Sequence, residues 1–323
     1  MKENIQTSIG NATGTSPMCK HVCDMIRDMK IGNRQFNNDH TYIMGILNVT
    51  PDSFSDGGKY NDVDKALKHI REMIKDGADI IDIGGESTRP GYLKITDQEE
   101  IERIAPVIER TIENFDIPIS VDTYKPKVAK EALELGANLI NDIWGLKGPD
   151  EHGMAKTIKK YEACCCLMHN RLMTADAFKN RTIESITNKH KVDQGDDTKV
   201  IPSEKIVDEI IENLKGSLKI AYEAGIDKDK ILIDPGVGFG KSYEENLGTL
   251  KYLKNIKDAF SLPMLLGTSR KSVIGLTLGL DKDQRLEGTL ATTARAVECG
   301  CMFVRVHDVK ENARFIKMYE AIK

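Results

Sequence analysis

Residues 63–85 read VDKALKHIREMIKDGADIIDIGG, an amphipathic stretch followed at once by a short apolar run. In residues 63–78 the apolar side chains recur at helical spacing, and Gly77 stands where a left-handed cap can end a helix. Residues 79–85 are rich in isoleucine and end in two glycines, which is typical of a buried strand. A helix followed directly by a buried strand predicts one unit of a parallel α/β sheet.

The same alternation continues along the chain from about residue 40. Short apolar runs rich in β-branched residues are separated by amphipathic stretches, and 126–137 and 287–301 are further clear helices. Eight repeats of strand then helix predict a closed (β/α)8 TIM barrel, an α/β fold that forms a single domain over residues 41–323. The predicted strands lie at residues 42–49, 79–85, 117–122, 138–143, 163–169, 231–236, 263–269 and 302–307.

Composition restricts the function classes. The 323 residues carry a net charge of −4, without the global basic excess of a nucleic-acid-binding protein. The chain shows no apolar leader and no apolar run of about 20 residues, so the sequence predicts a soluble cytoplasmic protein with no membrane partner. Cys164, Cys165 and Cys166 lie together in an apolar run, which favours buried reduced thiols over a disulfide framework.

Two polar segments depart from the repeat. Residues 1–40 show no clear periodicity, and we interpret them as a polar N-terminal extension or an edge-capping segment. Their CKHVC stretch at 19–23 offers three candidate ligands, whereas a closed structural zinc site needs four. Residues 171–202 form a polar insertion after the fifth predicted strand. We expect a solvated surface loop there, with a partner-binding or site-covering loop as the alternative.

Nearly every predicted strand ends in a polar group. Active sites of (β/α)8 barrels lie at the carboxyl ends of the strands. A single Asp or Asn at such a place is commonly a helix cap, but a complete set of polar strand ends indicates a functional surface. The strand-end residues are Asn48, Asp82, Asp122, Asn141, Asp142, His169, Asn170, Asp234, Ser269, Arg270, Lys271, Arg305, His307 and Asp308.

These side chains divide by charge. Arg89 and the basic residues at the last two strand ends suit an anion such as a phosphate. Asp122, Asn141 and Asp234 present acceptors that suit a flat heterocycle with several N–H donors along one edge, such as a pterin or guanine. No zinc-type spacing is present, so we expect any metal to be Mg²⁺ held partly by substrate phosphates. The DPGVGFGK stretch at 234–241 lacks the spacing of both glycine-rich nucleotide motifs, and its glycines favour a tight turn.

Seven motifs together resemble the dihydropteroate synthase family of folate biosynthesis, over about residues 41–323. They are GILNVTPDSFSDGG (45–58), GADIIDIGGESTRPG (77–91), ISVDTYKP (119–126), LINDIWG (139–145), LIDPGVGFGK (232–241), GTSRKSVIG (267–275) and VRVHDV (304–309). The resemblance implies a pterin-binding barrel that joins 6-hydroxymethyl-7,8-dihydropterin pyrophosphate to p-aminobenzoate, giving 7,8-dihydropteroate and pyrophosphate. It also implies a dissociative, Mg²⁺-assisted reaction and a p-aminobenzoate site at which sulfonamides bind.

The resemblance assigns a role to each matching position. Asn48 would hold Mg²⁺, the loop from 49 to 58 would close over the site, and Asp56 would lie near the developing cation. The implied catalytic residues are Asp56, Arg89, Lys271, Arg305 and His307. The implied pterin and pyrophosphate residues are Thr88, Asp122, Asn141, Ile143, Met168, Asp234, Lys271, Arg305 and His307. The implied p-aminobenzoate residues are Phe54, Thr88, Pro90, Phe239, Lys271 and Ser272.

Alternative interpretations remain at this point. A pterin-dependent methyltransferase would share the barrel and the acidic strand ends, but it would not need the 48–58 loop together with the SRKS and RVHD motifs. A non-catalytic paralogue would bind a pterin without turning it over. Arg305 could instead pair with Asp308 or another neighbour, and His307 could be a core histidine. By analogy with the family we also expect a homodimer, with the TLATTARAV stretch in helix 287–301 as a contact.

Overall fold

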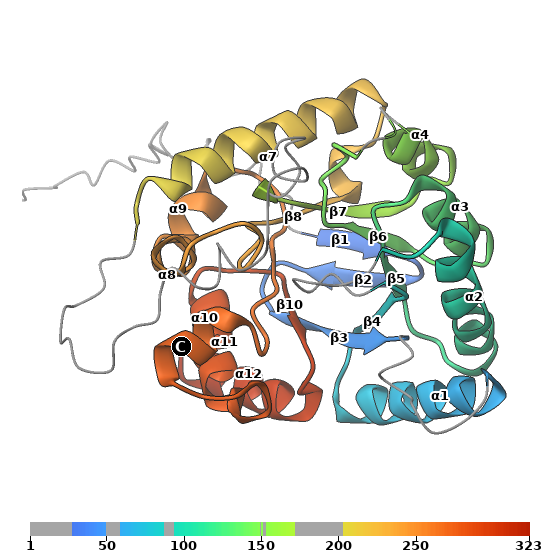
Figure 1. Ribbon diagram of the computed structural model, residues 1–323. Coiled ribbons are helices and arrows are strands. Elements are labelled where there is room, and N and C mark those ends of the chain that lie inside the picture. The colour runs from blue at the N-terminus through green and yellow to red at the C-terminus, as the bar shows by residue number, and fades with distance from the viewer. Residues whose placement is uncertain (1–27, 50–58, 87–93, 149, 151–152, 172–202) are drawn as a thin grey trace, which may run out of the picture.

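The computed structural model describes residues 28–49, 59–86, 94–148, 150, 153–171 and 203–323. Eight parallel strands form a barrel in the order β8-β7-β6-β5-β4-β3-β10-β9, and a bridge between Ile233 and Met264 joins its two edges. The predicted (β/α)8 architecture is confirmed (Figure 1). The strands are β3 (Tyr42–Asn48), β4 (Ile80–Gly84), β5 (Ile119–Asp122), β6 (Leu139–Asp142), β7 (Cys164–Met168), β8 (Ile231–Asp234), β9 (Leu265–Leu266) and β10 (Phe303–Val306).

Helices surround the strands, as Figure 1 shows. The helices expected at 63–78, 126–137 and 287–301 are present as α1, α3 and α11. A glycine with positive φ follows each of them closely: Gly77 at 107°, Gly136 at 110° and Gly300 at 70°. The helices are α1 (Lys59–Asp76), α2 (Asp97–Asn114), α3 (Pro126–Glu134), α4 (Gly153–Lys160), α7 (Ile206–Glu223), α8 (Tyr243–Lys251), α9 (Leu253–Asp258), α10 (Ser272–Leu278), α11 (Leu286–Glu298) and α12 (Val309–Ile322), with short 3₁₀ turns η4 (Lys228–Lys230) and η5 (Lys282–Gln284).

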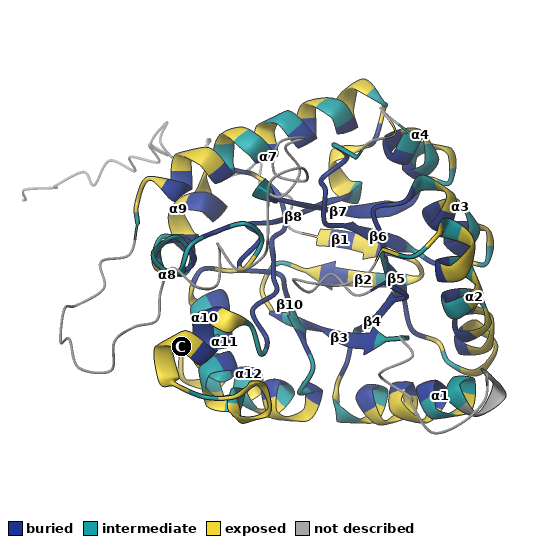
Figure 2. Cartoon of the chain, viewed as in Figure 1, coloured by how far each residue is buried: buried dark blue, intermediate teal, exposed yellow. Residues whose placement is uncertain are grey.

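A β-hairpin precedes the barrel, within a segment to which the sequence analysis assigned no secondary structure. Strands β1 (Asp28–Ile31) and β2 (Arg34–Asn37) pair antiparallel. Met29, Ile31 and Phe36 are buried in one cluster with the first residues of the barrel strands, such as Phe303. Apolar side chains of the hairpin therefore cover the amino end of the barrel, and β1 and β2 lie inside the ring of barrel strands in the view of Figure 2.

Side chains of each barrel strand alternate between two environments. Ile81, Ile140 and Ile233 pack against the surrounding helices in the main core. Ile80, Leu139 and Leu232, one residue earlier in each strand, belong to the inner cluster that the hairpin seals; this cluster also contains Met44, Cys164, Cys166, Leu265 and Phe303. Because strand side chains alternate with period two, the residue two positions further along each strand also points inward, at the carboxyl end. Those positions hold Asp82, Asn141 and Asp234.

The structure also bears on two expectations from the sequence, the absence of a membrane-spanning helix and the state of the cysteines. Within the described part of the chain, no helix is both long and apolar enough to cross a membrane. Cys164, Cys165 and Cys166 are buried and unpaired, as are Cys299 and Cys301. Burial raises the pKa of Cys164 to about 12, which keeps this thiol protonated and unreactive.

Candidate active site

Arg305 lies at the centre of the carboxyl end of the barrel. From β10 its Nε donates to Asp82 Oδ2 of β4 at 2.6 Å, and its NH2 group donates to Asp122 Oδ2 of β5 at 2.7 Å. The Arg305 side chain is 19% exposed, Asp122 is 10% exposed and Asp82 is fully buried. Two carboxylates and one guanidinium therefore form a largely buried ion-pair cluster with a net negative charge.

Neighbouring strands fix Asp82 within this cluster. Ser120 Oγ of β5 donates to Asp82 Oδ1 at 2.5 Å, and Asn141 Nδ2 of β6 lies 3.4 Å from Asp82 Oδ2. Asp82 was noted at a strand end in the sequence, but no role was assigned to it. The structure makes it the residue that holds Arg305 and Asn141 in place.

One carboxylate oxygen of Asp122 accepts no hydrogen bond from the described part of the chain. Its Oδ1 is buried and has no hydrogen-bond partner among the described residues, while its Oδ2 accepts from Arg305. Burial raises the pKa of Asp122 to about 7, although the positive charge of Arg305 opposes this shift. A buried acceptor without a partner is costly, so Asp122 Oδ1 is suited to accept an N–H donor from a ligand.

A further acidic side chain, Asp234, ends β8. Asp234 Oδ1 accepts from the Gly236 N–H at 2.7 Å, and burial raises the pKa of Asp234. A Cβ atom built on Gly267 would lie 3.7 Å from Asp234 Oδ2 and 3.9 Å from Lys271 Nζ. The glycine thus leaves space where Asp234, Lys271 and Arg305 converge.

Lys271 connects this acidic group to an aromatic ring. Its Nζ donates to the Val237 carbonyl at 2.6 Å and lies 4.7 Å from the centre of the Phe239 ring. Burial lowers the pKa of Lys271 to about 8, and the negative charge of Asp234 opposes this shift. Ser272, the next residue, is exposed and begins α10.

An apolar wall completes this end of the barrel. Ile143 and Met168 are buried in one cluster with Tyr124 and Trp144, and Phe239 packs against it. The Tyr124 and Trp144 rings stack with their centres 4.6 Å apart. Ile143 and Met168, which the sequence named as pocket-lining residues, are therefore neighbours here.

The basic side chains that follow β9 and β10 are bonded to each other's loops: His307 to Ser269, and Arg270 to Asp308. His307 Nδ1 lies 3.0 Å from Ser269 Oγ, and the His307 backbone N–H donates to the same hydroxyl at 3.2 Å. Arg270 pairs with Asp308, so Asp308 is not the partner of Arg305. Arg305 pairs with other neighbours, Asp82 and Asp122, as the second half of that alternative predicted. His307 is half-buried at the strand end rather than in the core.

Asn48 is the residue expected to hold a metal. It ends β3 beside Gly84, and a Cβ built on Gly84 would lie 3.8 Å from Asn48 Oδ1 and 3.6 Å from Asp122 Cβ. No group of three His, Cys, Asp or Glu side chains that could hold a metal occurs among the described residues. A single hard oxygen fits Mg²⁺ only where water and substrate phosphate supply the other ligands, which is how this ion is commonly bound.

Several expected site residues lie outside the described residues: Phe54, Asp56, Thr88, Arg89 and Pro90. The CKHVC stretch and residues 172–202 of the insertion also lie outside them. The described residues that flank 87–93 are joined by buried contacts. Lys125 Nζ donates to Glu86 Oε2 at 2.7 Å and to the Ile95 carbonyl at 2.8 Å, and the Ile95 N–H donates to the same Glu86 oxygen at 3.1 Å.

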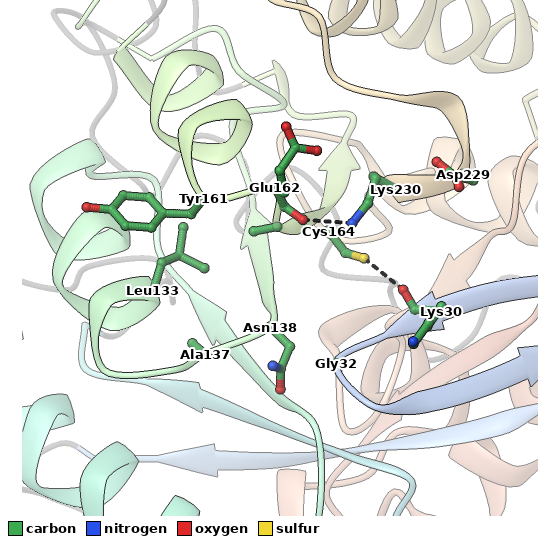
Figure 3. Close-up of a pocket in the computed structure, with 11 residues that line it drawn as sticks. Lys30, Gly32, Leu133, Ala137, Asn138, Tyr161, Glu162, Cys164, Asp229 and Lys230 are labelled. Atoms are coloured by element: carbon green, nitrogen blue, oxygen red, sulfur yellow. Dashed lines mark hydrogen bonds between the residues drawn. The ribbon is translucent and has the colours of Figure 1, made fainter.

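A cavity of about 400 Å³ lies away from the cluster around Arg305. Figure 3 shows the residues that line it. Its lining residues include Lys30 of the hairpin and Cys164, the first residue of β7. Lys230, just before β8, also lines it and donates to the Glu162 carbonyl at 2.8 Å. These residues belong to the amino ends of the strands, so the cavity is separate from the polar cluster.

Comparison with known proteins identifies the family of the chain. Residues 44–307 match the pterin binding enzyme family. The chain is 51% identical over 296 residues to a dihydropteroate synthase of Clostridium beijerinckii, across 91% of this chain and 99% of that one. It is 46% identical, with a TM-score of 0.75, to a dihydropteroate synthase of Clostridium difficile crystallised in the presence of pteroic acid, across 91% and 98% of the two chains. A Xanthomonas albilineans dihydropteroate synthase structure with 4-aminobenzoic acid has a TM-score of 0.78 at 35% identity, across 92% and 98%.

Proposed function

Because the chain belongs to the dihydropteroate synthase family of pterin binding enzymes, which are transferases, we propose that it joins 6-hydroxymethyl-7,8-dihydropterin pyrophosphate to p-aminobenzoate. The products are 7,8-dihydropteroate and pyrophosphate. The observation that carries the proposal is the cluster of Arg305, Asp82 and Asp122, in which Asp122 Oδ1 is buried with no donor among the described residues. Similarity to structures crystallised with pteroic acid or 4-aminobenzoic acid supports the two substrate classes.

The pterin ring binds among the acceptors at the ends of β5, β6 and β8. Asp122 Oδ1 and Asp234 Oδ2 accept N–H groups of the ring, and Asn141 supplies an amide. Ile143 and Met168 contact the flat faces of the heterocycle. Lys271 donates to the ring or its carbonyl oxygen.

Pyrophosphate binds on the basic side of the same space. Arg305 and His307 are the described donors, and we assign Thr88 and Arg89 to the same anion. Mg²⁺ would be held by Asn48, and when bound it supplies positive charge that favours the departure of pyrophosphate. We place p-aminobenzoate beside Phe239, Lys271 and Ser272, which are adjacent in the structure, and assign Phe54, Thr88 and Pro90 to the same subsite.

The reaction we propose is dissociative. The bond between the pterin methylene carbon and the pyrophosphate oxygen breaks, and its electron pair leaves with pyrophosphate. The positive charge that remains is delocalised over the pterin ring, where the Asp122 and Asp234 carboxylates stabilise it, together with Asp56. The neutral amine of p-aminobenzoate then forms the carbon–nitrogen bond, and its surplus proton passes to solvent, so no strong general base is needed.

Release of pyrophosphate tests this function. Purified protein is mixed with the dihydropterin pyrophosphate, with p-aminobenzoate and Mg²⁺ each present or omitted, and the products are separated by chromatography. We expect pyrophosphate release that depends on both additions and yields 7,8-dihydropteroate. Tight pterin binding without release would instead establish a non-catalytic pterin-binding protein.

The homodimer expected by analogy stays a prediction. Apolar side chains that a dimer contact would cover are exposed on α10 and α12. They are Leu276 (42% exposed), Leu278 (47%), Met318 (60%) and Ile322 (69%). Analytical ultracentrifugation of the full chain tests it, because a dimer and a monomer differ twofold in mass.

A further inference from the structure

Lys241 is a buried lysine beneath the turn that follows β8. It is 4% exposed, and its Nζ lies 2.6 Å from the Gly236 carbonyl oxygen and 2.7 Å from His169 Nδ1. No carboxylate of the described residues lies within 4.0 Å of this ammonium group. Burying a charge without a counter-ion costs free energy, so the two neutral acceptors are what holds Lys241 in place.

The tautomer of His169 follows from this contact. Burial lowers the pKa of Lys241 to about 7, and the negative charge of Asp234 opposes this shift. When Lys241 is an ammonium group, which has only donors, His169 Nδ1 accepts and the ring proton is on Nε2. His169 is fully buried, and burial, with the charge of Lys241, lowers its pKa to about 2, which keeps the ring neutral. Nε2 faces Glu209 Oε1 of α7 at 3.5 Å, and Glu209 is in turn paired with Arg171.

The turn itself connects Lys241 to Asp234. The Gly236 carbonyl accepts from Lys241, and the Gly236 N–H donates to Asp234 Oδ1 at 2.7 Å. Gly236 has a φ of 67°, and a Cβ atom there would lie 1.8 Å from the His169 carbonyl oxygen. The His169 N–H also donates to the Asp234 carbonyl at 3.0 Å. Lys241 thus links the residue that follows β7, His169, to the turn that follows β8, through its bond to the Gly236 carbonyl.

We propose that Lys241 is a positioning residue for the pterin site. By holding the Gly236 peptide against His169, it keeps the Gly236 N–H on Asp234 Oδ1, so that Asp234 Oδ2 remains directed toward Lys271 and the ligand space. Lys241 does not contact the ligand and acts through Asp234. This inference rests on the proposed function, because it takes Asp234 to be an acceptor for the pterin ring.

A double-mutant cycle tests the inference. The dihydropterin pyrophosphate is titrated by calorimetry into the wild type, Lys241→Met, Asp234→Asn and the double variant, well below each melting temperature. We expect Lys241→Met to weaken binding on the order of 10-fold to 100-fold, because misplacement of a binding group by about 1 Å has effects of that size. In the Asp234→Asn background the same substitution is expected to weaken binding by less than about twofold, since the group through which Lys241 acts is already altered.

Lys257→Met is the matched control. Lys257 in α9 is 7% exposed, and it receives the same substitution away from the strand ends. It is expected to leave pterin binding unchanged, whatever its effect on the melting temperature. If Lys241→Met is recovered unfolded, His169→Leu removes one of the two acceptors of Lys241 and is expected to weaken binding in the same direction, again only while Asp234 is present.

The outcomes separate the two claims. Wild-type pterin affinity in Asp234→Asn would contradict the proposed role of Asp234. Weak binding by Asp234→Asn with wild-type affinity in Lys241→Met, or in His169→Leu where that variant is used, would overturn the positioning role alone. An equal loss from Lys241→Met in both backgrounds would also overturn it, because Lys241 would then act independently of Asp234.

Discussion

The two ends of the barrel are built from the same strands but have opposite chemistry. Phe303 of β10 belongs to the apolar cluster at the amino end, and Arg305, two residues later, holds two carboxylates at the carboxyl end. Ile80 and Asp82 of β4 stand in the same relation, as do Leu232 and Asp234 of β8. Side chains two positions apart lie on the same face of a strand. A distance of about 7 Å along each strand therefore separates an apolar residue that stabilises the fold from a polar residue of the candidate site.

The difference concerns free energy as well as polarity. Burial of apolar side chains under the β1–β2 hairpin stabilises the fold. A buried ion-pair cluster contributes little net stability, because desolvation of the charges offsets their attraction. We therefore expect substitutions at the amino end to change the free energy of unfolding, and substitutions at the carboxyl end to change turnover.

Phe36→Ala has the largest expected effect on stability. The Phe36 ring is 2% exposed and lies 5.1 Å from the Phe303 ring, centre to centre. Its removal leaves a cavity and is expected to cost about 3–5 kcal/mol of unfolding free energy in urea titrations. Phe36→Leu, which keeps most of the volume, should lose less. The kcat of the folded variant should equal that of the wild type. A lower kcat under conditions where the variant is fully folded would contradict the claim that the amino end contributes to stability and not to turnover.

Arg305→Met is the converse change at the carboxyl end. It removes the guanidinium from Asp82 and Asp122 and, in the proposed reaction, a donor to pyrophosphate. We expect kcat to fall on the order of 10²-fold to 10³-fold, as for loss of one transition-state donor. The control Arg295→Met removes an α11 guanidinium that bonds the Leu250 carbonyl, and should change kcat by less than about twofold. Turnover near the wild-type value in Arg305→Met would contradict the assignment.

The pH dependence sharpens the comparison, because activity and stability should respond in opposite directions. The pKa of Asp122 is raised to about 7, so acidification through that value removes the carboxylate charge, and kcat/KM should fall roughly tenfold per pH unit below it. The folded state binds this proton more tightly than the unfolded chain does. Asp122 therefore contributes stability that increases as pH falls from about 7 towards about 4, the ordinary pKa of aspartate.

Asp122→Asn is the control for both trends. It should remove the acid limb of the pH–rate profile and this residue's share of the pH dependence of unfolding. An unchanged acid limb in the variant would assign the titration to another group.

Lys230→Met has the smallest expected effect. Lys230 lines the amino-end cavity, and its ammonium group bonds the Glu162 carbonyl at 2.8 Å. Loss of this exposed hydrogen bond should cost less than about 1 kcal/mol of unfolding free energy. Steady-state assays should give unchanged kcat and KM values, and a substantial change in either would show that the cavity takes part in function.

The barrel and its polar strand ends could be predicted because they depend on local patterns. Alternating apolar runs and helices define the strands, and the carboxyl end of a strand is visible in the sequence. The β1–β2 hairpin was missed because Met29, Ile31 and Phe36 are few and lie among polar residues. These side chains are buried only because they pack against the amino ends of the barrel strands, a tertiary contact that the local sequence pattern does not indicate.

The pairings within the site could not be predicted for a related reason. Arg305 and Asp82 are 223 positions apart, so their contact follows from barrel closure rather than from spacing. Ser269 is a strand-end residue and Lys241 ends the DPGVGFGK stretch, but only the folded structure shows that Ser269 bonds His307 and that Lys241 bonds the Gly236 carbonyl. A buried lysine in a glycine-rich stretch carries no sequence signal that distinguishes support from phosphate binding.

The most direct test of the account is the affinity of the pterin substrate for the carboxyl end of the barrel. The measurement is calorimetric titration of 6-hydroxymethyl-7,8-dihydropterin pyrophosphate into the wild type and Asp122→Ala, with Lys230→Met as the amino-end control. The account predicts wild-type affinity in Lys230→Met and binding weakened on the order of 100-fold in Asp122→Ala, because a charge-assisted hydrogen bond in a buried site is lost. Undiminished binding by folded Asp122→Ala would contradict it.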